Sequence, residues 1–489
     1  MHEASFAVSL VPGIGAASNS HFGLHNIKMT GPPSIDSAGY HRSKDAGVGA
    51  FSSFHDFKIT AERDIEAGME IFANYGVKYF TMDKREKEFG EVPFEEHYKE
   101  ADSLMDTFWK DIADRSGSDI EAEKIYQQVL DSVSEPRVKK LMPSSFQKAK
   151  ASKGVSSAMF STPTAVRSKD WLKQNGMCID NMYAAQSTIS QAGRGAFASR
   201  NLKQGQTISP MPTIAIHKQF LRQFQGEQEV IKAQVFNYVY GHEKSSIALL
   251  PYSPIVNFVN NHEDKSRVNA RIQWSTSPYH DKSWEAQSAE YIISQRRVGL
   301  IMDLVATKDI EKDDEIFIDY GKSWDEAWAD HVDHWEPSST SEDHTSIGEL
   351  NARNELQTEE EQELVPLGSN VQSICLLDIE EVMYDINHGE RTFKWKDYAV
   401  DTMDLVSYNM EVCVISKRSK VEDSDSKESV YRIYLEGEGG RRLYVDDVPR
   451  DAIRFTDKPY ESDHHLNNAF RHYIHVPDGM FPAPWMDLN

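Results

Sequence analysis

Cysteines, basic residues and long apolar runs are all scarce in this chain. Its 489 residues include only 3 cysteines, namely Cys178, Cys375 and Cys413. Three cysteines are too few for a disulfide framework or for a four-cysteine zinc site. We therefore expect an intracellular protein, nuclear or cytoplasmic, from a reducing compartment.

No apolar run approaches the ~20 residues that a membrane-spanning helix requires. The N-terminal stretch SFAVSLVPGIGAA lacks a basic region and is interrupted by Pro12 and by two glycines, so it does not read as a signal peptide. A soluble protein without a membrane partner is expected.

Positive charge is in deficit, with 53 Lys and Arg against 77 Asp and Glu and a net charge of −24 at pH 7. Direct nucleic-acid binding is not expected, because phosphate recognition needs clustered basic side chains. An acidic surface is compatible with a basic partner, such as a Lys-rich protein segment. Simple solvation explains most of the excess charge equally well.

One motif is written twice. Residues 61–76 read AERDIEAGMEIFANYG and residues 306–321 read ATKDIEKDDEIFIDYG, which agree at nine of sixteen positions without a gap. Both copies keep a glutamate (Glu70 and Glu315) and end in Tyr-Gly. In the second copy Asp313 stands where the first has the turn glycine Gly68.

The length predicts two to four domains, and composition suggests where they meet. Residues 1–80 are strand-and-turn material, and 81–168 form a helical connector in which apolar spacing predicts helices over 94–112 and 120–133. Residues 169–330 contain many short strands around a helical insert at 219–239. An acidic, Glu-rich stretch at 331–366 is predicted to be a disordered linker. In residues 367–457 apolar and polar positions alternate, which predicts a small β-barrel of four or five strands. Residues 458–489 are predicted to form a helix followed by a Pro-rich coil.

Three pieces of the 169–330 block occur in a characteristic order: QAGRGAFASRNLKQGQTI, LLPYSPIVNFVNNHEDKSRVNARIQW and ATKDIEKDDEIFIDYG. Together they resemble the SET domain of protein lysine methyltransferases, and most of all the subgroup with a large helical insert. The resemblance covers roughly a third of the chain. It implies an α+β, SET-type β-fold in which the two later pieces cross as a pseudoknot around a narrow channel. The cysteine-rich zinc module that follows many such domains is absent from the sequence.

The same resemblance implies a binding site for S-adenosylmethionine. Backbone groups around Arg194, Gly195 and Ala196 would cradle the cofactor, and the missing Cβ of Gly195 would allow a close approach. Asn261 and His262 would hold its methionine and adenine portions. The spacing leaves open whether Asn260-Asn261 or Asn261-His262 is the key pair.

Tyr320 would lie where the cofactor's methyl group meets the lysine amine. Methyl transfer needs in-line approach of a neutral amine, so geometry is the main catalytic lever, and a tyrosine hydroxyl orients the amine without adding charge. The segment that follows carries Trp324 and Trp328, either of which could close the channel. The plainer alternatives are a buried strand-end tyrosine for Tyr320, a surface turn residue for Arg194 and a loop histidine for His262.

These observations favour an S-adenosylmethionine-dependent protein lysine N-methyltransferase that acts on a histone or non-histone protein. The alternative is a non-catalytic SET-fold scaffold or a chromatin- or protein-binding module. Residues 1–80 resemble only the C-terminal half of a second SET unit, which we expect to pack on a neighbouring domain without activity. The echo of AGRGAF in AGVGAF at 46–51 is coincidental, because too few residues follow it before the next motif.

Two further groups of residues were considered as sites. The predicted barrel is similar in pattern to Tudor-like chromatin readers, in which Tyr431, Tyr434 and Tyr444 could form a cage for methylated lysine, although alternating aromatics are more often core. The tail histidines are interpreted as a solvated helix face, and no metal site is predicted; these are His464, His465, His472 and His475.

Overall fold

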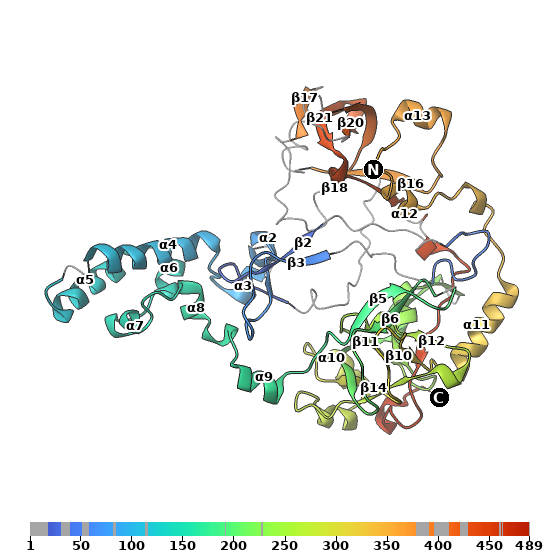
Figure 1. Cartoon of the computed structure of the whole chain (residues 1–489), viewed down its shortest axis with the longest axis horizontal. Coiled ribbons are helices and arrows are strands. Elements are labelled where there is room, and N and C mark those ends of the chain that lie inside the picture. Colours follow the sequence, from blue (N-terminus) through green and yellow to red (C-terminus); the bar gives the residue numbers. More distant parts are fainter. Residues whose placement is uncertain are drawn as a thin grey trace.

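The structure is a computed structural model of the whole chain. It describes residues 18–30, 40–50, 58–81, 85–112, 116–190, 192–225, 228–377, 391–395, 410–420, 429–458, 461 and 463–488. A helical arm extends from one side of a central β-rich domain, and a second β-rich unit lies above that domain in the view of Figure 1. Within these ranges, none of the helices is both long enough and apolar enough to cross a membrane.

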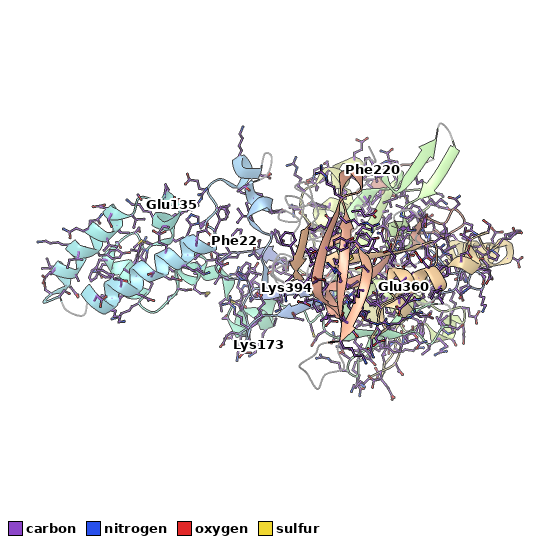
Figure 2. All side chains as sticks on the ribbon, turned by 90° about the horizontal axis from the view of Figure 1, so that it is seen from above. Phe22, Glu135, Lys173, Phe220, Glu360 and Lys394 are labelled. Carbon is purple, nitrogen blue, oxygen red and sulfur yellow. A yellow bond between two sulfur atoms is a disulfide. The ribbon has the colours of Figure 1, made fainter. Side chains whose placement is uncertain are left out.

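The arm is built from helices (Figures 1 and 2), most of which contribute to one apolar core. The two helices expected from apolar spacing are present, and the first continues into a π-helical turn at Phe108–Ile112. Side chains of Phe108, Tyr126 and Val138 are fully buried between the helices. Several of the helices begin at a serine whose hydroxyl accepts a backbone N–H, which satisfies an otherwise unpaired donor. The helices are α2 Val77–Thr81, α3 Arg85–Phe89, α4 Glu95–Thr107, α5 Asp119–Ser132, α6 Pro136–Leu141, α7 Phe146–Ala151, α8 Ser157–Ser161 and α9 Lys169–Asn175.

The central domain is organised around a six-stranded sheet in the order β13-β14-β7-β11-β10-β23. A hairpin of β5 and β6 and the helices α10 (Ala289–Ser294) and α11 (Lys322–His334) complete it. Its core includes Ile208, Met211 and Leu249, all fully buried. The strands are β5 Met182–Gln186, β6 Arg194–Ala198, β7 Thr207–His217, β10 Tyr240–Gly241, β11 Ile247–Pro251, β13 Ala270–Trp274, β14 Ile301–Ala306 and β23 Ile474–His475.

A chain crossing joins the two later motifs of this domain. Strand β12 (Asn260–Asn261) pairs in parallel with β15 (Phe317–Ile318). The Asn269 side chain locks the crossing: its Nδ2 donates to the Glu315 carbonyl at 2.8 Å, and its Oδ1 accepts from the Phe317 N–H at 2.8 Å. Two segments about 50 residues apart in sequence are thus tied through backbone groups that would otherwise be buried without partners.

The first copy of the repeated motif has the same crossing. Strand β1 (Asn19–Ser20) pairs in parallel with β4 (Phe72–Ala73). Asn26 donates to the Glu70 carbonyl at 2.9 Å and accepts from the Phe72 N–H at 3.0 Å, as Asn269 does in the second copy. Strands β2 (Ile27–Thr30) and β3 (Lys58–Ala61) pair antiparallel, which reproduces the pairing of β13 with β14. The two copies therefore share backbone geometry as well as sequence.

The insert at 219–239 is a β-hairpin between two 3-10 turns, so the prediction of a helix there is wrong. Strands β8 (Arg222–Gln225) and β9 (Gln228–Lys232) pair antiparallel. In the flanking turns Leu221 and Phe236 are buried against Leu250 in a small satellite core. Burial of both flanks brings the ends of the segment together, and tertiary packing overrides the local helical pattern.

The stretch 331–366 is ordered, which corrects the prediction of a disordered linker. It contains the end of α11, then α12 (Ile347–Asn351) and α13 (Glu359–Leu364). Ile347, Leu350 and Leu356 are buried in the core of the C-terminal β unit. The few apolar residues of this stretch are spaced so that they all pack against the C-terminal β unit. The high glutamate content makes this spacing hard to recognise in the sequence.

The C-terminal β unit consists of two sheets that share one core. One sheet has the order β18-β16-β22 and the other β17-β21-β20-β19. Cys375 of β16 and Cys413 form a disulfide bond, which reasoning from the low cysteine count did not foresee. The strands are β16 Val371–Leu376, β17 Arg391–Lys394, β18 Met410–Val412, β19 Val414–Lys420, β20 Ser429–Glu436, β21 Arg442–Pro449 and β22 Ile453–Asp457.

The three tyrosines considered for a methyl-lysine cage already make contacts with other residues of this unit. Tyr431 is buried, and its hydroxyl accepts from the Leu356 N–H at 3.0 Å. The guanidinium of Arg442 lies 4.2 Å from the Tyr434 ring centroid, and that of Arg432 lies 5.0 Å from the Tyr444 centroid. The chain's own cations therefore occupy two of the aromatic faces that a cage would offer.

The tail at 458–489 has no α-helix in its described residues, so the helix predicted there is wrong. Its backbone instead adds β23 to the edge of the central sheet, in parallel with β10. Phe481 and Trp485 are buried in the core of the central domain, and the Trp485 indole donates to the Gln287 carbonyl at 3.1 Å. His464 is half-buried, and burial lowers its pKa to about 3, whereas His465 is exposed.

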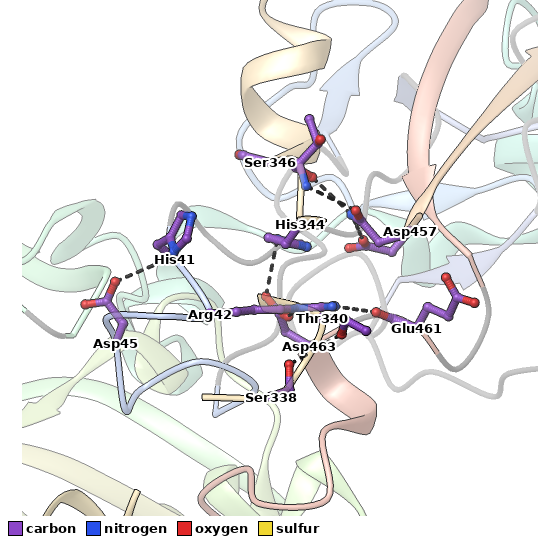
Figure 3. Close-up of polar contacts among 12 residues, drawn as sticks. His41, Arg42, Asp45, Ser338, Thr340, His344, Ser346, Asp457, Glu461 and Asp463 are labelled. Atoms are coloured by element: carbon purple, nitrogen blue, oxygen red, sulfur yellow. Dashed lines mark hydrogen bonds and ion pairs between the residues drawn. The ribbon is translucent and has the colours of Figure 1, made fainter. Parts of the chain in front are cut away.

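A buried charge cluster joins three distant segments (Figure 3). The guanidinium of Arg42 is paired with Asp463 and also donates to the Glu461 carbonyl. His344 approaches the same carboxylate, with Nε2 3.9 Å from Oδ2. All three side chains are almost completely buried. This contact ties the segment 40–50 to the tail and to the stretch that precedes α12.

Candidate functional site

The candidate site lies where the loop before β6 meets the pseudoknot of β12 and β15. The loop closes on itself through a hydrogen bond from the Ser187 N–H to the Gly193 carbonyl at 3.0 Å. Gly193 has a φ of 64°, a conformation that favours glycine. Strand β6 then starts at Arg194, so the loop presents its backbone at one end of the strand.

The Glu315 carboxylate holds the loop before β6 in place through hydrogen bonds. This buried carboxylate accepts hydrogen bonds from the Ser187 hydroxyl at 2.7 Å and from the Thr188 N–H and hydroxyl at 2.7 and 2.5 Å. A Cβ on Gly195 would collide with the same carboxylate. Glycine is therefore required at 195 because the glutamate approaches the backbone so closely.

Asn260 connects this network to the backbone of β6. Its Nδ2 donates to the Arg194 carbonyl at 3.0 Å and lies 3.3 Å from Glu315 Oε1. Its Oδ1 accepts no hydrogen bond from the part of the chain that the structure describes. The Asn260 side chain is thus held in place through its Nδ2, and its Oδ1 is an available acceptor next to the glycine loop.

Asn261, by contrast, is fully engaged within the protein. Its Nδ2 donates to Asp325 at 2.7 Å, while its Oδ1 accepts from Lys265 Nζ at 3.0 Å and from the Tyr320 N–H at 3.2 Å. The residue therefore positions the backbone of Tyr320. This geometry distinguishes the two asparagines, whose order the sequence had left open.

Tyr320 ends the second copy of the repeated motif, and its hydroxyl points back into the pseudoknot. The hydroxyl donates to the Val259 carbonyl at 2.6 Å. Burial, followed by the nearby Tyr240 and Tyr238, raises the pKa of this hydroxyl well above its ordinary value. The group is therefore a neutral hydroxyl at physiological pH.

An aromatic cluster covers Tyr320 from the side of α11. The Trp324 ring meets the Tyr320 ring edge-on with centroids 4.9 Å apart, and Trp328 stacks on Trp324 at 5.8 Å. Phe470 of the tail lies 5.3 Å from Trp324. Either Trp324 or Trp328 was considered able to close the channel, and Trp324 is the one in contact with Tyr320.

The remaining predicted site residues are divided between this place and its periphery. Ala196 is fully buried in β6, and the Arg194 guanidinium lies 4.6 Å from the centroid of the Phe258 ring. His262 packs its ring edge-on against Phe317 at 5.0 Å, and its Nδ1 accepts from the Asp264 N–H. The structure thus brings Arg194, Gly195 and Ala196 close to Asn260, while His262 is part of the turn that follows.

Sequence reasoning missed several residues of this site. Glu315 carried a signal, since it is identical in the two copies of the motif, but its structural partner Ser187 did not. Tyr40 was not considered either, because it lies about 150 residues before the glycine loop. In the structure its ring packs on that loop, such that a Cβ on Gly193 would lie 3.1 Å from the Tyr40 hydroxyl.

Comparison with known proteins agrees with the resemblance seen in the sequence. The family model described as the SET domain matches residues 193–321. A search of curated proteins finds no match. The match begins at Gly193 and ends at Gly321, so it covers the second copy of the motif and the site described above. The assignment of residues 1–80 as a partial SET repeat stays a prediction.

Solved structures that align with part of the chain were also found. A candidate histone methyltransferase of Plasmodium falciparum shares 22% identity over 29% of this chain and 96% of its own, with a TM-score of 0.20. Polycomb repressive complex 2 of Chaetomium thermophilum shares 15% identity over 33% of this chain and 18% of its own, with a TM-score of 0.22. A polycomb repressive complex 2 in an autoinhibited conformation bound to S-adenosylmethionine shares 16% identity over 33% of this chain and 17% of its own, with a TM-score of 0.21.

With TM-scores of 0.20 to 0.22 these alignments carry no part of the assignment, which rests on the family match together with the local geometry. The ordered motifs, the pseudoknot of β12 and β15 and the family match all fall on one segment. Residues 193–321 of this chain are accordingly assigned as a SET domain.

Proposed function

We propose that this protein is an S-adenosylmethionine-dependent protein lysine N-methyltransferase. The SET match at 193–321 supports the reaction class. The single observation that carries the proposal is the environment of Tyr320, whose neutral hydroxyl is anchored on the Val259 carbonyl beside the Asn260 network. A fixed, uncharged hydroxyl at that place suits the orientation of an amine.

The residues around Gly193 fit the proposed cofactor. When bound, S-adenosylmethionine supplies an electrophilic methyl group on a sulfonium. The free Oδ1 acceptor of Asn260 suits the ammonium of its methionine portion, and the backbone of Arg194–Ala196 lies beside it. We assign the binding role to Asn260, with Asn261 as the residue that positions Tyr320.

The chain's contribution to the chemistry is positioning and dehydration. A free lysine amine has a pKa of about 10.4, and an enclosed site favours its uncharged form. The hydroxyl of Tyr320 already donates its one hydrogen bond to the Val259 carbonyl. Its lone pairs are therefore left to accept a hydrogen bond from an N–H of the amine. The amine is thereby aligned without a charged neighbour, and alignment is the largest effect available to this reaction.

The proposed substrate is a lysine in a protein, either a histone or another protein. The net charge of −24 suits a basic segment and argues against direct binding of nucleic acid. A nuclear or cytoplasmic location remains our expectation.

A non-catalytic scaffold is the second candidate function. The observation in its favour is the packing of Tyr40 against the glycine loop, together with the complete engagement of Asn261. In a scaffold these contacts would hold the domain in one conformation for binding to another protein.

Cofactor binding separates the two candidates. Calorimetric titration of the full chain with S-adenosylmethionine is expected to show micromolar binding that weakens at least about tenfold in Asn260→Ala, because a charged group loses its hydrogen-bond acceptor. The matched control is Asn19→Ala, since Asn19 occupies the equivalent position of β1 and donates to Glu70 at 2.7 Å. Absence of binding by the wild-type protein would favour the scaffold.

Methyl transfer then tests the role of Tyr320. With labelled cofactor and a protein extract, Tyr320→Phe is expected to lower the rate by about 100-fold or more, as loss of one positioned polar group does in other enzymes. Tyr75→Phe in the first copy is the matched control, because the Tyr75 hydroxyl makes the equivalent bond to the Ser18 carbonyl. If Tyr75→Phe abolishes transfer and Tyr320→Phe does not, the first copy carries the chemistry.

A further inference from the structure

Two histidines and an aspartate from distant parts of the chain converge at the edge of the central sheet. Strands β10 and β23 pair in parallel, with Gly241 opposite His475, and His242 follows directly after β10. The two imidazole rings lie with centroids 5.2 Å apart. Asp478 follows in the turn after β23, with Oδ1 3.8 Å from His475 Nε2. One nitrogen or oxygen atom from each residue lies within 4.8 Å of the others.

We propose that His242, His475 and Asp478 bind a divalent transition-metal ion of the zinc class. Two imidazoles and a carboxylate are the ligand types that zinc prefers, whereas magnesium and calcium take oxygen ligands. Three protein ligands leave a fourth tetrahedral position for water. Zinc–ligand bonds of about 2.0–2.2 Å require the three groups to close by roughly 1–2 Å. Asp478 can supply this movement, because its side chain is 96% exposed.

The surroundings of His475 point to a missing partner. Its Nδ1 is buried and has no hydrogen bond within the described residues. A buried polar atom without a partner is uncommon and calls for an explanation such as a bound ion. His242 has its Nδ1 bonded to the Lys244 N–H, so coordination through Nε2 would move the ring proton to Nδ1 and give up that bond in an exposed turn.

The electrostatic environment also favours a cation. The carboxylates that face the two rings are Asp319, Glu243 and Asp478. The opposing charges are Lys218, whose ammonium donates to the His242 carbonyl at 2.5 Å, and Lys265, whose Nζ lies 2.8 Å from Asp319 Oδ1. Because negative charge exceeds positive charge around the rings, a dication would reduce the local imbalance.

The position of the trio gives the ion a structural task. The His475 N–H donates to the Tyr320 carbonyl at 2.9 Å, and a Cβ on Gly321 would lie 2.6 Å from the His475 Cβ. An ion held by His242 and His475 would fasten the tail strand to β10 directly beside Tyr320. The ion would therefore stabilise docking of the tail and the position of Tyr320, whether or not the domain transfers methyl groups.

The test uses the full chain after treatment with EDTA, titrated with ZnCl2 by calorimetry and with CoCl2 by visible absorption. Wild type is expected to bind one ion per chain. His242→Ala is expected to weaken binding at least about 100-fold, since losing a group that merely orients a ligand already costs 10–100-fold. Asp478→Asn should weaken it by about tenfold or more and, being at an exposed position, should leave the fold intact. His334→Ala, which removes an exposed histidine of α11, is the control and should bind like wild type.

Thermal unfolding supplies an independent readout. Zinc in excess is expected to raise the Tm of wild type and of the His334→Ala variant by about 5 °C, and to leave the His242→Ala variant unchanged. His475→Ala is avoided because that residue packs on Gly321. The proposal is overturned if wild type does not bind zinc, or if His242→Ala and Asp478→Asn bind it as tightly as the control does.

Discussion

Two equivalent turn residues adopt the same left-handed backbone conformation although one is a glycine and the other an aspartate. Gly68 has a φ of 97° and Asp313, its counterpart in the second copy, has a φ of 70°. Aspartate tolerates the left-handed region better than most residues, and here its carboxylate also accepts a hydrogen bond from the Tyr183 hydroxyl at 2.9 Å. In the first copy a Cβ at 68 would run into the Arg167 carbonyl, so no side chain fits.

We therefore expect opposite tolerance at the two positions. Gly68→Ala should lower the free energy of unfolding by more than about 1 kcal/mol, because it adds both strain and a collision. Asp313→Gly should change it by less than about 0.5 kcal/mol, because relief of strain offsets the lost hydrogen bond and the more flexible unfolded chain. Chemical denaturation of both variants measures the contrast, and equal effects would contradict it.

A buried histidine predicts how stability depends on pH. Burial, and then the nearby Arg42, lower the pKa of His344 to about 4 from 6.5. Between these two values the unfolded chain binds the proton and the folded chain does not. The contribution of His344 is therefore complete above pH 6.5 and is lost as the pH falls toward 4.

At pH 5 this one group is expected to cost roughly 2 kcal/mol of unfolding free energy relative to pH 7.5. His344→Gln should remove that share of the pH dependence, measured by urea unfolding at both pH values. The control is His334→Gln, because His334 is exposed and the backbone and side chain of Asp330 raise its pKa. An unchanged slope in His344→Gln would contradict the assignment.

At the scale of elements, the tail behaves as part of the central domain. Trp485 is fully buried in the same core as Ile208 and Met302. Asp487 accepts hydrogen bonds from the Ser246 N–H and hydroxyl at 2.7 and 2.5 Å. The segment is therefore held by apolar burial and by polar contacts near its end.

Trp485→Ala should consequently behave as a core substitution, lowering the free energy of unfolding by about 3–5 kcal/mol. The control is Phe220→Ala, because Phe220 is 73% exposed and should change stability by less than about 0.5 kcal/mol. Differential scanning calorimetry can compare the two. Similar Tm values for both variants would show that the tail is not required by the core.

How well each element was predicted from sequence depends on where its stabilising contacts lie. The helices α4 and α5 carry their own amphipathic pattern, and β7, β11 and β14 carry dense apolar runs, so both kinds were predictable. The hairpin at 222–232 and strand β23 depend on contacts with segments far away in the chain. The local sequence pattern does not indicate such contacts, and both segments were predicted to be helical.

At the scale of the whole molecule, the candidate site shows the same division. Gly195, Tyr320 and the pseudoknot follow from motifs in one stretch of sequence. Tyr40 and Ser187 come from segments that meet the motifs only in the fold. The metal trio is likewise assembled from residues more than 200 positions apart, so spacing rules for contiguous metal motifs do not detect it.

The docking of β23 also sets the order in which the domain can be completed during synthesis. The ribosome finishes residue 321 about 150 residues before it reaches β23. At roughly 5–20 residues per second, the nascent domain waits about 8–30 s with one sheet edge unpaired and the site of Trp485 open. During that interval it presents an unpaired strand edge, which is a template for edge pairing, and apolar core surface that is not yet covered. Docking of β23 and of Trp485 then pairs that edge and fills that part of the core.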